Sequence, residues 1–67
     1  MDNHKNTFMK VIEIEAEDFT YTILNEAAND FAKLRASNCY NISDAKPVVI
    51  NGKLYYTFTI RVWKDRA

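Results

Sequence analysis

The residue types on which catalysis, metal binding and disulfide formation depend are scarce in this sequence. Its 67 residues include one cysteine, one histidine, one glycine and one proline. The single cysteine, Cys39, excludes an internal disulfide. His4 lies far from it in the chain, so a metal site would need carboxylate ligands, for which no spaced cluster is present. The only glycine, Gly52, is required by a hairpin turn and leaves none for a phosphate-binding loop. We therefore expect no enzymatic activity, no metal and no cofactor.

Two remaining groups of reactive side chains have simpler structural explanations. No base or orienting group can be assigned to Cys39, and we interpret it as a small buried apolar residue rather than a nucleophile. Glu13, Glu15 and Glu17 alternate along a strand-like segment, as a catalytic carboxylate group could. Glu13 and Glu15 would both point to water, so we interpret them as a solvated ladder.

Long apolar runs and an excess of one charge are also missing. The apolar runs are only a few residues long, so the sequence predicts neither a membrane-spanning helix nor a signal peptide, and we expect a cytoplasmic protein. Lysine and arginine together number nine, as do aspartate and glutamate. A net charge of zero gives no general attraction to nucleic acid or to anionic membranes, and we expect neither as a partner.

The charges are nevertheless divided unevenly along the chain. Residues 1–30 carry seven acidic and two basic side chains, whereas residues 31–67 carry seven basic and two acidic ones. Two interpretations stay open. Either the folded surface is dipolar and steers a charged partner, or the two halves neutralise each other across neighbouring strands.

Length and composition predict one small folded domain. Hydrophobic residues make up 48% of the chain and aromatic residues 13%, which is typical of a packed core rather than a disordered segment. Residues 1–7 are polar and lack any period, so we expect a disordered tail there and a single domain at residues 8–67. Because a domain this small buries little of its surface and has no disulfide, we expect it to associate with copies of itself.

Periodicity predicts a strand followed by a helix in the first half. At residues 8–16, Ile12 and Ile14 alternate with Glu13 and Glu15, which favours a strand with one buried face. Apolar residues then recur at spacings of three and four, as in an amphipathic helix with one face on a core. These residues are Leu24, Ala27, Ala28, Phe31 and Leu34. Three residues are candidate N-caps of the helix: Asp18, Thr20 and Thr22.

A strand with an irregularity is predicted next, at residues 39–50. Its alternation breaks where Asp44 and Lys46 occupy positions that should be buried. Pro47 cannot donate a hydrogen bond to a neighbouring strand. We therefore expect an edge strand with a bulge near Asp44 to Pro47.

A tight turn and the longest strand complete the chain. Asn51-Gly52 between two apolar runs is typical of a type I′ hairpin turn, in which both central residues have a positive φ. Residues 54–64 then alternate without interruption, with Phe58 among the inward side chains. We predict that Phe58 meets Phe31 of the helix in the core.

These elements predict an α+β fold of β-α-β-β order. The expected sheet has three strands of antiparallel type in the order 1-3-2, with the helix packed on one face. The other face is left open and is our candidate binding surface, because Trp63 and Val11 are costly to leave in water. Its expected residues are Val11, Glu13, Glu15, Tyr55, Thr57, Thr59, Arg61 and Trp63. We predict a register with Val11 opposite Trp63 and Glu13 opposite Arg61, which pairs apolar groups and charges together.

The helix contains LNEAANDFAKL (residues 24–34) and is followed by YNISDA (residues 40–45) and an aromatic-rich last strand. Together these segments resemble the small Cse-type sporulation proteins of Firmicutes. Within the helix, Glu26, then Asn29 or Asp30, and Phe31 approximate that family's E-x-x-x-N-x-F pattern. The resemblance implies the same β-α-β-β order and an accessory role in a host or phage.

Three other segments form a second pattern: residues 10–14 (KVIEI), 51–53 (NGK) and 58–62 (FTIRV). They resemble dodecin, a hollow dodecamer that stacks flavins between subunits. The positions that correspond to dodecin's flavin-stacking Trp and to its Gln hold Tyr40 and about Thr57 here. The resemblance implies a small-ligand binder with flavin or nucleotide sites between subunits.

Two functions of different classes follow from the sequence. The first is a self-associating protein-interaction module, such as a phage or accessory inhibitor or adaptor, that acts through the open sheet face. The second is a small-ligand binder whose sites form between subunits. Exposed edge strands suit the addition of a strand from a partner in either case.

Overall fold

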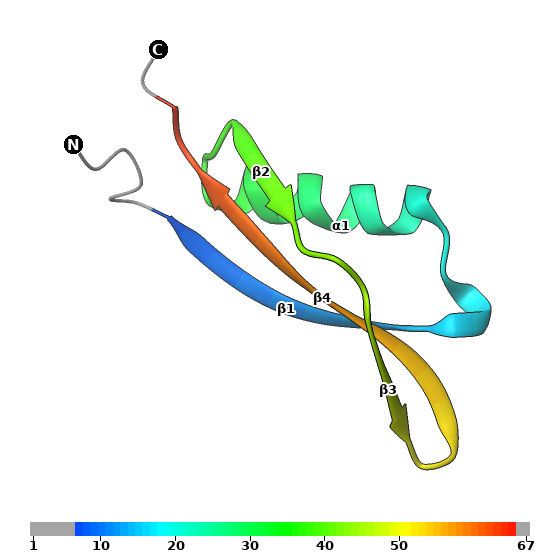
Figure 1. Ribbon diagram of the computed structural model, residues 1–67. Coiled ribbons are helices and arrows are strands. Elements are labelled where there is room, and N and C mark those ends of the chain that lie inside the picture. The colour runs from blue at the N-terminus through cyan, green and yellow to red at the C-terminus, as the bar shows by residue number, and fades with distance from the viewer. Residues whose placement is uncertain (1–6, 66–67) are drawn as a thin grey trace.

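The computed structural model describes residues 7–65 as one helix packed on an open antiparallel sheet of four strands (Figure 1). The elements are β1 (Phe8–Glu15), the 3-10 turn η1 (Ala16–Asp18), α1 (Tyr21–Leu34), β2 (Cys39–Ile42), β3 (Lys46–Ile50) and β4 (Lys53–Trp63). The expected α+β class with one helix is confirmed. The tail expected at residues 1–7 lies, apart from Thr7, outside the described residues.

The long strand β4 pairs with every other strand of the sheet. β1 pairs along one side of β4, while β2 and β3 pair with successive parts of β4, and all three pairings are antiparallel. Three strands were expected and four are found, because the segment predicted as one strand at residues 39–50 is divided into β2 and β3.

A bulge separates β2 from β3. Ile42 lies opposite Ile60 of β4, and Lys46 lies opposite Thr57. Residues 43–45 therefore face only two residues of β4, which confirms the predicted bulge. One extra residue turns every following side chain to the other face of the sheet. Lys46, which the alternation of the sequence assigned to a buried position, therefore lies on the face opposite the helix.

A serine side chain bridges the gap that the bulge leaves in the ladder. The backbone N–H of Thr59 donates to Ser43 Oγ at 2.9 Å, and the N–H of Ser43 donates to the carbonyl oxygen of Thr59 at 3.0 Å. The hydroxyl thus takes the position that a backbone carbonyl occupies in a regular ladder. The edge formed by β2 and β3 stays attached to β4 through the bulge.

The register between β1 and β4 differs from the predicted one. Val11 lies opposite Thr59 and Glu13 lies opposite Thr57, a displacement of four residues along β4. In this register β1 ends beside Tyr55, and Phe19, just after η1, reaches the ring of Phe58 at 5.5 Å between centroids. Burial of these rings outweighs an exposed ion pair, which is worth about 0.2–1 kcal/mol.

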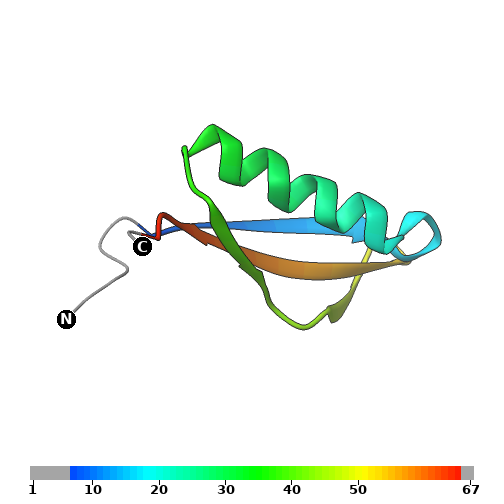
Figure 2. The ribbon, with the colours of Figure 1, turned by 90° about the horizontal axis from the view of Figure 1, so that it is seen from above.

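The helix α1 covers one face of the sheet and leaves the other bare (Figure 2). Of the candidate caps, Thr20 is the N-cap, because its Oγ1 accepts a hydrogen bond from the N–H of Ile23 at 3.1 Å. The buried stripe consists of Leu24, Ala28, Phe31 and Ala32. Leu34 was expected on this stripe, but it belongs to the last turn of the helix and is 75% exposed.

The C-terminus of α1 is closed by a Schellman motif built on an alanine. The N–H of Ser37 donates to the carbonyl of Ala32 at 2.8 Å, and the N–H of Ala36 donates to the carbonyl of Lys33 at 3.1 Å. Ala36 has a φ of 53°, a left-handed conformation that glycine adopts more easily than alanine. The type I′ turn predicted at Asn51-Gly52 is present, with φ values of 51° and 79°.

The core has two parts. The first comprises Ala28, Phe31, Ala32, Ile60 and Val62, with Ile12, Ala27 and Ile42 packed against it. The second is an aromatic group in which Phe19 contacts Tyr21, Tyr56 and Phe58, with ring centroids 5.2, 5.7 and 5.5 Å away. Phe31 and Phe58 are both buried. They belong to different parts of the core, however, and the contact predicted between them is replaced by packing of Phe31 near Ile60 and of Phe58 on Phe19.

Candidate functional site

The eight residues predicted for the binding surface lie on the face of the sheet that α1 does not cover. Buried Phe58, Ile60 and Val62 face the helix, and side chains alternate along a strand. The intervening residues of β4 and the residues of β1 opposite them therefore point the other way. We call this surface the open face. From β1 and β4 it presents Val11, Glu13, Glu15, Tyr55, Thr57, Thr59, Arg61 and Trp63.

Exposure varies across the open face. Val11 is 62% exposed and its neighbour Met9 is 60% exposed. Tyr55 and Trp63 are half-buried, as are the threonines between them in the sequence. The face thus combines partly sheltered aromatic rings on the central strand with wet apolar side chains on β1.

The bulge adds residues to the open face that sequence reasoning missed. After the extra residue, β3 directs Lys46, Val48 and Ile50 to this face, since they lie opposite Thr57, Tyr55 and Lys53. The broken alternation at Asp44 and Lys46 was the available signal. It predicts the bulge but not the number of extra residues in it, and that number decides which face of the sheet β3 presents.

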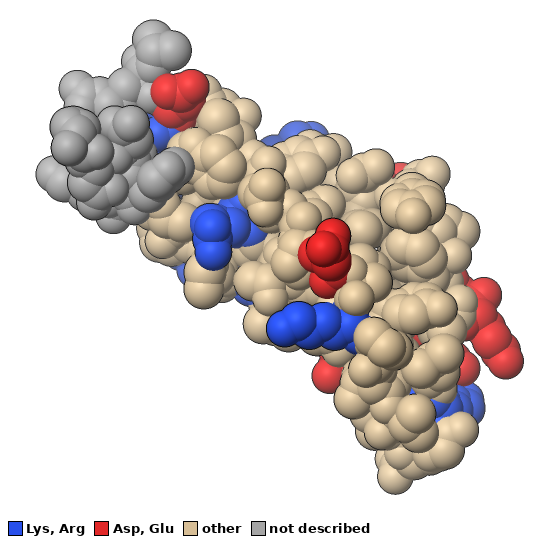
Figure 3. Space-filling model, viewed as in Figure 1, with Lys and Arg blue, Asp and Glu red and all other residues tan. Residues whose placement is uncertain are grey.

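Acidic and basic groups occupy different strands of the open face. Glu13 and Glu15 lie on β1, while Arg61 and Lys53 lie on β4. The pair predicted between Glu13 and Arg61 is not formed, because Arg61 lies opposite Met9. Instead Lys53 Nζ lies 3.6 Å from Glu15 Oε2, near the hairpin. Lys46 on β3 adds a third basic group to this face, and Figure 3 shows uncharged surface between the charged side chains.

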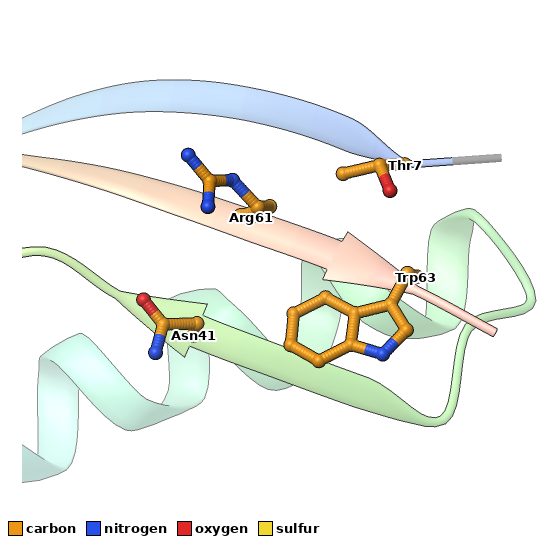
Figure 4. A pocket seen from close by; sticks show the side chains of 4 residues that line it. All are labelled: Thr7, Asn41, Arg61 and Trp63. Atoms are coloured by element: carbon orange, nitrogen blue, oxygen red, sulfur yellow. The ribbon is translucent and has the colours of Figure 1, made fainter. Parts of the chain in front are cut away.

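A shallow hollow of about 470 Å³ lies on the open face and is lined by Thr7, Asn41, Arg61 and Trp63. Figure 4 shows the indole of Trp63 lying across β2 beside Asn41, while the guanidinium of Arg61 extends on the side of β1. An aromatic ring, a guanidinium and an amide in one hollow can stack a flat group and hydrogen-bond its edge.

A second hollow of about 600 Å³ lies on the helix side, where the start of α1 meets the bulge. Its lining consists of Phe19, Tyr21, Leu24, Asn25, Ile42, Ser43, Asp44, Ala45, Tyr56 and Phe58. The aromatic part of the core thus forms its floor, and Asp44 supplies its one carboxylate. Sequence reasoning did not predict this hollow, because it depends on the position of the bulge beneath the helix.

Two features are absent from residues 7–65. No three or more His, Cys, Asp or Glu side chains in this part of the chain gather closely enough to hold a metal ion. The one helix found there lacks the length and apolar character needed to cross a membrane.

Comparison of the chain with protein-family models, with curated proteins and with solved structures found no match. The resemblances to the Cse-type sporulation proteins and to dodecin therefore remain predictions.

Proposed function

We propose that this protein is a small, non-catalytic binding protein that associates with copies of itself and meets a protein partner through the open face. The observation that supports this most is the open face itself. It places the half-buried ring of Trp63 and the exposed Val11 on a sheet surface that no described element covers. Apolar and aromatic side chains in that position are typical of an interaction surface.

The charges of the open face indicate the chemistry of the partner. Acidic groups line the β1 side, at Glu13 and Glu15, and basic groups line the other side, at Arg61 and Lys46. A complementary protein surface carries basic side chains opposite β1 and acidic ones opposite β3 and β4. Such pairing selects a partner and its orientation more than it adds affinity. This suits an inhibitor or adaptor in a phage or sporulation system, acting in the cytoplasm.

β2 and β3 together form one edge of the sheet. β2 and β3 lie along the same side of β4 and differ from one strand only by the bulge. We treat them as one interrupted edge strand. On that view the chain keeps a β-α-β-β plan with β4 in the centre, and the interruption is a local device that turns Lys46 and Val48 to the open face.

Site-specific cross-linking tests the use of the open face. A photoreactive amino acid is placed at Thr57, in the middle of the face, and separately at Asn29 on the exposed side of α1. We expect a covalent adduct of one defined mass from Thr57 only, and we expect Arg61→Glu to weaken it. The same adducts from both positions, or none from Thr57, would contradict the proposal. Self-association is tested separately by sedimentation equilibrium at micromolar concentration, where a monomer would contradict it.

A second candidate function is supported by the hollow beside Trp63. Its indole, with Arg61 and Asn41, suits a flat anionic ligand such as a flavin or a nucleotide. Trp63 is the chain's only tryptophan, so its fluorescence reports on this hollow. We expect quenching by riboflavin phosphate that Arg61→Gln weakens and Lys53→Gln does not. A colourless protein of unmodified mass, with no quenching, would exclude this function.

A further inference from the structure

The two edges of the sheet are built differently. The edge formed by β2 and β3 is interrupted by the bulge at residues 43–45 and carries Pro47. Bulges and prolines are devices by which proteins block the addition of another strand. β1 runs for eight residues without either, and within residues 7–65 no strand pairs with its outer side. One edge is therefore protected and the other is open.

The hydrogen bonds at Ser43 show which backbone groups of β1 face outward. Thr59 directs both its N–H and its carbonyl oxygen to Ser43, on the β2 side of β4. Because these groups alternate along a strand, Phe58 and Ile60 direct theirs to β1. Their partners Ile12 and Lys10 therefore bond to β4. The odd-numbered residues of β1 consequently present their N–H and carbonyl groups to the free edge.

The same strand concentrates exposed apolar side chains. Phe8, Met9 and Val11 are 36%, 60% and 62% exposed, and they lie on both faces of β1. The helix makes its main contacts with β2 and β4, so it leaves the outer edge of β1 accessible. A long edge with free backbone groups and wet apolar side chains is a template for another strand.

We propose that the partner at this edge is β1 of a second copy, paired antiparallel about a two-fold axis at Val11. This rests on the proposed self-association and specifies its interface. In this register Val11 lies opposite its own copy on the open face, and Phe8 lies opposite the partner's Ile14 on the helix face, twice by symmetry. Valine pairs and aromatic pairs with β-branched residues are favourable across strands. The result is one eight-stranded sheet with a continuous open face.

Neighbouring registers are less favourable. Moving the two-fold axis by one residue shifts the pairing by two residues, so that opposed side chains still lie on the same face of the sheet. Centring the pair on Lys10 or on Glu13 opposes like charges at the axis. Centring it on Ile12 sets Phe8 against Ala16 and both Met9 and Val11 against glutamates, whereas the Val11 axis sets only Met9 against a glutamate. With Val11 at the axis no like charges lie directly opposite. The ammonium of Lys10 is drawn to its own Phe31 ring, at 5.7 Å from the centroid.

The test uses one substitution at two matched positions. Val11→Lys places two lysines at the axis, whereas Val49→Lys makes the same change on the protected edge, where Val49 is 67% exposed. Sedimentation equilibrium is measured for the wild type and both variants, with circular dichroism as a check of folding. We expect the dimer dissociation constant to rise about tenfold or more for Val11→Lys, which corresponds to about 1.4 kcal/mol, and to stay unchanged for Val49→Lys.

Charge complementation tests the register itself. Val11→Lys and Val11→Glu should each be largely monomeric, and mixing them should restore dimers that contain one chain of each. A wild type that associates while Val11→Lys behaves like Val49→Lys would overturn this interface but leave the proposed function standing. A mixture that stayed monomeric would overturn the axis at Val11. A monomeric wild type would overturn both the interface and the proposed self-association.

Discussion

Replacing Ala36 by glycine should raise the free energy of unfolding. Ala36 occupies the left-handed position of the Schellman motif after α1, with a φ of 53°. Its side chain is exposed, so its removal takes away no packing. The hydrogen bonds from Ala36 and Ser37 to the last turn of α1 use backbone atoms only and remain available to glycine. Ala36→Gly therefore changes the free energy of unfolding only through the backbone conformation at this position.

The expected gain is the difference between two backbone effects. A residue with a Cβ costs roughly 1–2 kcal/mol in the left-handed region. Glycine loses more conformational freedom on folding, which costs roughly 0.5–1 kcal/mol relative to alanine. The net stabilisation of Ala36→Gly is then about 0.5–1 kcal/mol. For a domain of this length, about 1 kcal/mol moves the melting temperature by roughly 4–8 °C.

Urea denaturation followed by circular dichroism measures this difference. Ala45→Gly is the matched control, because Ala45 is also exposed, lies in the bulge and has no positive φ. It should lose about 0.4–1 kcal/mol through the unfolded chain alone. Opposite signs for the two variants support the reasoning. A loss at Ala36 equal to that at Ala45 would refute it.

Four further substitutions test other parts of the fold. Gly52→Ala should lower the free energy of unfolding by about 0.5–1 kcal/mol, by the same difference of backbone effects at its φ of 79°, since nothing lies within 4 Å of the new Cβ; an unchanged denaturation midpoint would exclude the type I′ turn. Ser43→Ala should cost about 0.5–1.5 kcal/mol and accelerate hydrogen exchange at the Thr59 amide, whereas unchanged exchange would mean that the hydroxyl does not complete the ladder. Phe31→Ala and Phe58→Ala should each cost about 3–5 kcal/mol, and a retained midpoint in either would contradict the assignment of the core.

Features fixed by neighbours in the sequence could be predicted. The N-cap at Thr20 and the turn at Asn51-Gly52 depend on residues within one turn of the chain, and both were among the expected positions. The left-handed conformation of Ala36 carries no such signal, because alanine is not a residue that favours it. The end of α1 at Leu34 therefore lacks the glycine that often marks a helix C-terminus in a sequence.

The division of the edge strand into β2 and β3 could be predicted only in part from the sequence. Pro47 and the charged Asp44 and Lys46 predicted an irregularity, and the structure contains one there. The face that β3 presents depends on how many extra residues the bulge contains relative to β4, since one extra residue moves every side chain between the bulge and the hairpin to the other face. The sequence alone did not give the number of extra residues, and so β3 was left out of the candidate binding surface.

The incorrect register and the correctly placed side chains have one explanation. A displacement of four residues along β4 is an even number, so it changes the residues opposite Val11 and Glu13 but leaves both on the open face. The charges that suggested the predicted register are exposed and worth at most about 1 kcal/mol for each pair. Phe19, which lies outside the strands, stacks on Phe58 with a gain of about 0.5–1.5 kcal/mol beyond burial of the rings. Charge alternation along a half-exposed strand therefore predicts which side chains can reach a partner, while contacts made by the connecting segment decide which residues lie opposite each other.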